Sequence, residues 1–118
     1  MIIAIDFDGV LVEDKFPEIG PPDTLIINAV KSVIKAGHEV ILWTCRVGKR
    51  LEDAILWCER HRLDFAAINS PSPTNLAEYG TNPRKVYADY YIDDRMLGYS
   101  RFETVVLLKK ISRGELQR

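Results

Sequence analysis

The sequence contains little cysteine and no long apolar run, and its charges nearly cancel. Cys45 and Cys58 are its only cysteines, and they form no CxxC pair and match no zinc-binding spacing. No stretch approaches the ~20 apolar residues of a membrane-spanning helix. The formal net charge of −1 provides no general attraction to nucleic acid or to a membrane surface. Cysteine-based zinc sites and membrane-spanning helices are therefore not expected, and no membrane partner is expected.

The remaining composition is that of one ordinary globular domain. Hydrophobic residues make up 47% of the chain and charged residues 28%, as in many globular proteins. The 118 residues suit a single domain over 1–118, and no linker, repeat or low-complexity segment divides them. The start, Met1-Ile2-Ile3, lacks the basic region of a signal peptide. We therefore expect a cytoplasmic protein with reduced thiols.

Two kinds of apolar segment alternate along the chain. Short apolar runs predict strands, and longer segments with apolar residues at helical spacing predict helices. Strands are expected at residues 2–6, 39–44, 64–69, 86–92 and 103–107, and helices at 24–36 and 48–62, with one helical turn near Leu76. Residues 11–22 are expected to form a flap or loop, and 109–118 a basic tail, helical in part.

This alternation indicates an α/β fold with a mostly parallel sheet covered by helices on both faces. Right-handed crossovers bring the carboxyl ends of parallel strands to one edge of the sheet. Asp6, Thr44, Lys85 and Asp93 then lie at or near the same edge. That edge is where open α/β sheets bind their ligands.

Pairs of acidic residues follow two of the predicted strands. Asp6 and Asp8 follow the apolar run 1–5, and Asp93 and Asp94 end the strand 86–92. A solvated Asp-Gly turn would explain the first pair without any function. However, an ionised carboxylate that leaves water costs several kcal/mol unless it is paired or bound to metal. Because four neighbouring carboxylates repel one another unless a cation lies among them, these oxygen ligands point to Mg²⁺.

The order of these residues resembles the four motifs of the haloacid dehalogenase-like (HAD) superfamily of aspartate-nucleophile phosphatases. The motifs are matched in order by Asp6-x-Asp8-Gly-Val, by Thr44 after Ile41-Leu42-Trp43, by Lys85, and by Ile92-Asp93-Asp94. The resemblance covers residues 1–95. It implies a single Rossmann-like three-layer domain with a five-stranded sheet of order 5-4-1-2-3. Only residues 11–22 separate the first motif from the first predicted helix, so a member without a cap domain is expected.

The resemblance also implies a role for each catalytic residue. Asp6 would attack phosphorus and form an aspartyl-phosphate. Asp8 would protonate the leaving oxygen and later take a proton from water. The Thr44 hydroxyl and the Lys85 ammonium would hold the phosphate oxygens.

The implied cofactor is Mg²⁺. Its expected ligands are Asp6, Asp93 and the backbone carbonyl of Asp8, while Asp94 would support these ligands without binding the metal directly. Arg46 is a candidate substrate contact through a second anionic group, although a solvated surface position explains it as well.

The implied function is Mg²⁺-dependent hydrolysis of phosphate monoesters. A non-catalytic or phosphoryl-transferring HAD-like domain that binds a partner stays open as the alternative. A response-regulator receiver fits poorly, because its phosphorylated aspartate would end the third strand, where this chain has Asn69-Ser70. A cysteine phosphatase built on Cys45 would need arginine at position 51, which is Leu51. The sequence leaves the size of the phosphorylated substrate open, and a homo-oligomer would be one way to close a cap-less site.

Overall fold

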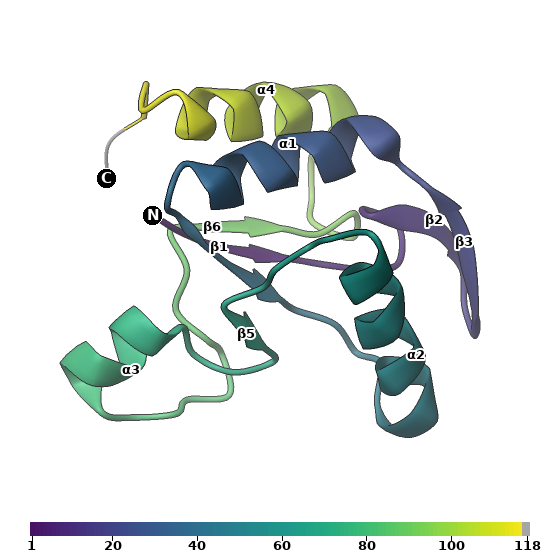
Figure 1. The fold of residues 1–118 in the computed structure, drawn as a ribbon, viewed down its shortest axis with the longest axis horizontal. Coiled ribbons are helices and arrows are strands. Elements are labelled where there is room, and N and C mark those ends of the chain that lie inside the picture. Colours follow the sequence, from purple (N-terminus) through teal and green to yellow (C-terminus); the bar gives the residue numbers. More distant parts are fainter. Residues whose placement is uncertain (117–118) are drawn as a thin grey trace.

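A parallel sheet of four strands forms the centre of the molecule in the computed structural model, which describes residues 1–116 (Figure 1). The strand order is β5-β4-β1-β6. These strands span Ile2–Ile5 (β1), Glu39–Leu42 (β4), Ala67–Ile68 (β5) and Tyr90–Ile92 (β6). The α/β class and the parallel sheet are therefore confirmed. The last two residues of the expected tail 109–118 lie outside the described part of the chain.

The larger core lies on one face of this sheet. Helices α1 (Thr24–Lys35) and α4 (Arg101–Ser112) lie side by side there, and buried residues of α2 (Gly48–Arg60) belong to the same core (Figure 1). On the other face, Ala4 and Ile41 pack against Val86 and Ala88, which precede β6. That covering segment forms neither helix nor strand, whereas a helical layer was expected. Within residues 1–116, no helix is long and apolar enough to cross a membrane.

The fifth strand predicted at 103–107 is wrong, because these residues lie within α4. The run Val105-Val106-Leu107-Leu108 is rich in β-branched residues and favours a strand locally. In the structure, the Ser100 side chain caps the helix by accepting a hydrogen bond from the Glu103 N–H, and the buried residues Leu108 and Ile111 follow helical spacing. The five-stranded order 5-4-1-2-3 is therefore also wrong, although the other four strands keep the neighbours it gave them.

The segment expected as a flap or loop, residues 11–22, forms an antiparallel hairpin of β2 (Val12–Lys15) and β3 (Glu18–Pro22). At Gly20, a Cβ atom would come within 2.1 Å of the Glu13 carbonyl oxygen, so only glycine allows the two strands to approach this closely. The hairpin extends away from the sheet beyond the end of β1 (Figure 1). The turn expected near Leu76 is a full short helix, α3 (Pro73–Tyr79).

Candidate active site

A cavity of about 640 Å³ lies at the carboxyl edge of the sheet. Its lining brings together five residues expected at the site: Asp6, Asp8, Thr44, Arg46 and Asp93. The other lining residues are Asp14, Phe16, Trp43, Cys45, Asn69, Arg84 and Arg95. The parallel register explains the convergence, because Asp6 follows β1, Asp93 follows its neighbour β6, and the Asp6 N–H donates to the Ile92 carbonyl at 2.9 Å.

Three carboxylates form a cluster beside this cavity. Asp6, Asp93 and Asp94 each offer one oxygen, and these oxygens all lie within 4.8 Å of one another. Gly9 makes room for the third carboxylate, since a Cβ atom there would lie 2.2 Å from Asp94 Oδ2. The positive φ of Gly9, +88°, also suits glycine. The glycine of the Asp-x-Asp-Gly turn thus lets Asp94, from the second acidic pair, pack against the turn.

Crowding changes the acidity of this cluster. Burial is the main cause that raises the pKa of Asp6 to about 7, and the charges of Asp93, Asp94 and Asp8 add to it. The Phe7 N–H, which donates to Asp6 Oδ1 at 2.8 Å, opposes this rise. Burial and the neighbouring Asp93 also raise the pKa of Asp94. The positive groups of the chain therefore do not fully balance the negative charge of these three carboxylates.

The donor set fits a hard divalent cation such as Mg²⁺. All three groups are carboxylates, whose oxygens are the ligands that Mg²⁺ prefers, and Asp6, Asp93 and Asp94 are the residues that would hold it. The expected ligands were Asp6, Asp93 and Asp8. Asp94 was expected only to support the ligands, but its carboxylate lies within the cluster itself. The Asp8 carboxylate lies outside the cluster. The expected contribution of Asp8 through its backbone carbonyl stays a prediction.

The raised pKa of Asp6 predicts how the stability of the metal-free protein depends on pH. The pKa is 3.8 in the unfolded chain and about 7 in the folded one, so between these values the folded state holds a proton that the unfolded state has lost. The stabilisation is complete below the lower pKa and is lost as pH rises through the higher one. The free energy of unfolding should therefore fall as pH rises, and Asp6→Asn should make this fall smaller by about 1–2 kcal/mol, after allowance for solvent screening.

Urea unfolding in EDTA at about pH 4.5 and about pH 7.5 measures the slope. Asp64→Asn is the matched control, because Asp64 is an exposed aspartate away from the cluster. A fall of the wild-type size in Asp6→Asn would assign the pH dependence to another group.

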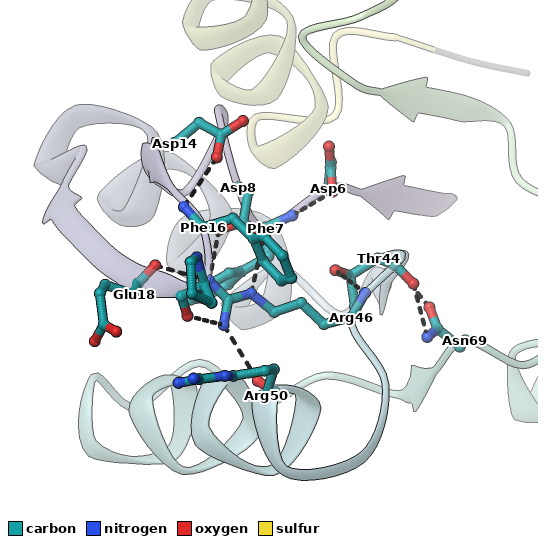
Figure 2. A network of polar contacts seen from close by, with 11 residues as sticks. Asp6, Phe7, Asp8, Asp14, Phe16, Glu18, Thr44, Arg46, Arg50 and Asn69 are labelled. Atoms are coloured by element: carbon teal, nitrogen blue, oxygen red, sulfur yellow. Dashed lines mark hydrogen bonds and ion pairs between the residues drawn. The ribbon is translucent and has the colours of Figure 1, made fainter.

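The Asp8 carboxylate is paired with the guanidinium of Arg46 (Figure 2). Arg46 Nε donates to Asp8 Oδ2 and Nη2 donates to Oδ1, both at 2.8 Å. This two-bond geometry is the strong form of an arginine–carboxylate pair. Arg46 is only 2% exposed, and hydrogen bonding with Asp8 raises its pKa further above its usual value.

The other hydrogen-bond donors of Arg46 bind backbone carbonyls. They reach Pro17 at 3.3 Å, Arg50 at 3.3 Å and Glu18 at 3.0 Å, so that all five guanidinium N–H groups have partners within the chain. Arg46 was expected to contact substrate, but in this state none of its guanidinium N–H groups is free to do so. A buried arginine could not be recognised from the sequence, in which Arg46 is followed by the further cations Lys49 and Arg50.

Thr44 is fixed by Asn69, a residue that sequence analysis did not assign to the site (Figure 2). The Thr44 N–H donates to Asn69 Oδ1 at 2.8 Å, and Asn69 Nδ2 donates to the Thr44 carbonyl at 2.9 Å. The Thr44 hydroxyl accepts a hydrogen bond from the Arg46 N–H at 3.2 Å. Asn69 has a left-handed backbone, φ 51°, which asparagine tolerates well. An asparagine at the carboxyl end of the strand predicted at 64–69 was the available signal.

The expected phosphate ligand Lys85 lies outside the cavity lining. Its side chain is exposed, and Nζ lies 5.3 Å from the centroid of the Tyr91 ring. Two arginines that sequence analysis did not assign, Arg84 and Arg95, line the cavity instead. The Arg95 N–H donates to Asp93 Oδ1 at 2.9 Å, which ties this residue to the acidic cluster. In the sequence, Arg84 directly precedes Lys85 and Arg95 directly follows Asp93-Asp94, and these positions could have assigned both arginines to the site.

Comparison with known proteins identifies one relative. No family model matches the chain, and no curated protein does. A solved structure of the conserved protein coded by a locus from Bacteroides thetaiotaomicron is similar, with a TM-score of 0.81 and 33% sequence identity over 99% of this chain and 93% of that one. The chain belongs to the family of this conserved protein. This similarity supports the fold over 99% of the chain and assigns no activity.

Proposed function

We propose that the chain is a Mg²⁺-dependent phosphate monoester hydrolase of the HAD-like type, with a Rossmann-like fold and no cap domain. The observation that carries this proposal is the placement of Asp6. Its carboxylate lines a cavity at the carboxyl edge of the sheet and belongs to the acidic cluster that fits a divalent cation. A second carboxylate, Asp8, follows two residues later and lines the same cavity. These are the parts that hydrolysis through an aspartyl-phosphate requires.

The chemistry divides into two displacements. The Asp6 carboxylate attacks phosphorus as the bond to the ester oxygen breaks, and Asp8 gives its proton to that oxygen. Asp8 then takes a proton from a water molecule that attacks the same phosphorus, and the bond between phosphorus and Asp6 breaks to release phosphate. A Mg²⁺ ion held by Asp6, Asp93 and Asp94 would offset the repulsion between the carboxylates and the incoming phosphate.

Thr44 and a cation complete the phosphate site in this proposal. We keep Lys85 as that cation because its contact with the Tyr91 ring is weak at an exposed position, about 0.5–1 kcal/mol, and its long side chain can leave that ring. Lys85→Met should therefore lower kcat/KM by about 100-fold, and Arg84→Met by less than about tenfold.

Steady-state kinetics of the two variants on one aryl phosphate makes the comparison. Arg113→Met, an exposed change at the end of α4, controls for the loss of one positive charge. A larger loss in Arg84→Met than in Lys85→Met would transfer the role to Arg84, the residue that lines the cavity.

One observation favours the alternative of a partner-binding domain that does not hydrolyse phosphate. Both oxygens of the Asp8 carboxylate are engaged by Arg46, so the general acid is not free in this state. A phosphate-release assay separates the two functions. The hydrolase should release phosphate from 4-nitrophenyl phosphate with Mg²⁺, and EDTA should stop it. A screen of phosphorylated metabolites and nucleic-acid ends then defines the substrate. No release from any of these compounds would leave the partner-binding function.

A further inference from the structure

Arg46 connects the acid/base candidate Asp8 to the β2–β3 hairpin. One edge of its guanidinium binds the Asp8 carboxylate, while other donors bind the carbonyls of Pro17 and Glu18 at the turn of the hairpin (Figure 2). A change in the position of the hairpin must therefore alter the surroundings of a group that holds Asp8.

Aromatic contacts strengthen this connection. The Arg46 guanidinium carbon lies 5.1 Å from the centroid of the Phe7 ring and 5.2 Å from that of Phe16. Phe7 is fully buried beside the nucleophile candidate Asp6, whereas Phe16 is 58% exposed in the hairpin turn. Phe16 and Asp14 also line the cavity, so the hairpin forms one of its walls. Backbone hydrogen bonds of Val12 hold the base of the hairpin, and Arg46 ties its turn to the site.

We propose that Arg46 is a positioning residue that couples closure of the β2–β3 hairpin to the orientation of Asp8. This inference rests on the function proposed above. A guanidinium that is 2% exposed needs its charged partner and its carbonyl partners together, because removal of either leaves buried donors unsatisfied. The closed hairpin and the oriented Asp8 therefore form or separate as one unit.

The coupling has a consequence for proton transfer. While both oxygens of Asp8 accept hydrogen bonds from Arg46, the carboxylate is held outside the cluster of Asp6, Asp93 and Asp94. To protonate a leaving oxygen, Asp8 must release one of these bonds. Arg46 therefore influences the proton-dependent step more than the attack by Asp6.

Leaving groups of different acidity test this role. Nitrophenolate leaves readily without a proton, whereas an alkoxide requires one. Arg46→Lys keeps the positive charge and loses the two-bond geometry. We expect it to lower the single-turnover rate of leaving-group release by about 100-fold for a simple alkyl phosphate and by less than about tenfold for 4-nitrophenyl phosphate. Asp8→Asn should show the same preference, with a larger loss on the alkyl phosphate. Arg50→Lys is the control, because only its backbone carbonyl contacts Arg46.

A second measurement follows the hairpin without using activity. Lys15 is exposed at the end of β2, so trypsin cleavage after Lys15, identified by mass spectrometry, reports opening of the hairpin. Arg46→Lys and Asp8→Asn should each increase the cleavage rate by about tenfold or more, and Arg50→Lys should not. Asp8→Asn is the decisive variant, since no hydrogen bond joins its side chain to the hairpin turn within the described residues.

The outcomes separate the coupling from the proposed function. Equal losses on both substrates in Arg46→Lys, or an unchanged cleavage rate in Asp8→Asn, would overturn the positioning role. If the wild-type protein releases phosphate from neither substrate, the hydrolase proposal fails, and the cleavage rates still decide whether Arg46 couples the hairpin to Asp8.

Discussion

Asp6→Asn and Asp8→Asn should each lower the rate of phosphate release by about 10³-fold or more. The losses are large because, in the proposed mechanism, nucleophile and acid/base act on the same bond as a unit. An amide at position 6 cannot form the aspartyl-phosphate, and an amide at position 8 cannot give a proton to the leaving oxygen. Release of phosphate from an alkyl phosphate at saturating Mg²⁺ measures both losses.

The two substitutions should differ in their effects on stability, which separates lost chemistry from lost folding. Asp6→Asn removes a half-buried charge that its neighbours repel, so the metal-free protein should stay as stable as wild type near neutral pH. Asp8→Asn leaves the buried Arg46 without its charged partner and should destabilise the fold. Urea unfolding of each variant accompanies the assay, with Asp64→Asn as control. Full activity in a folded Asp6→Asn protein would contradict the covalent mechanism.

Mg²⁺ at about 100 times its dissociation constant should raise the free energy of unfolding by about 2.7 kcal/mol, because only the folded state presents the clustered carboxylates of Asp6, Asp93 and Asp94. Asp93→Asn should remove most of this gain. The same change relieves repulsion with Asp6 and Asp94, so the metal-free variant should be as stable as wild type or slightly more stable.

Thermal and urea unfolding of both proteins, with Mg²⁺ and with EDTA, tests this prediction. Asp64→Asn again serves as the control and should keep the full gain. A metal-free Asp93→Asn protein that is clearly less stable, but still gains stability from Mg²⁺, would make Asp93 a structural residue and would move the metal site elsewhere.

The parts of the fold that depend on local patterns were predictable from the sequence. The apolar run before Asp6 and the run Val40-Ile41-Leu42 form adjacent parallel strands, and their carboxyl ends place Asp6 and Thr44 at one cavity. The prediction at 103–107 failed because the β-branched residues there outweighed the helical spacing of Leu108 and Ile111. Packing of α4 against α1 decides this segment, and such tertiary contacts are not visible in a local window.

The arrangement within the site was less predictable, because it depends on contacts between distant residues. Asp8 and Arg46 are 38 positions apart, and nothing in the spacing shows that their side chains pair. The bond between Asn69 and Thr44 likewise spans 25 positions. The sequence could identify which residue types gather at the edge of the sheet, but not which of them neutralise each other there.

Identification of the phosphorylated residue would test the central claim most directly. The protein is mixed with an excess of a ³²P-labelled phosphate monoester and Mg²⁺, quenched in acid within one turnover, and digested for peptide mapping. The account predicts label on the peptide that contains Asp6, its loss on treatment with hydroxylamine as expected for an acyl phosphate, and no label in Asp6→Asn or in EDTA. Steady phosphate release with label on another residue, or with the Asp6→Asn protein as active as wild type, would contradict it.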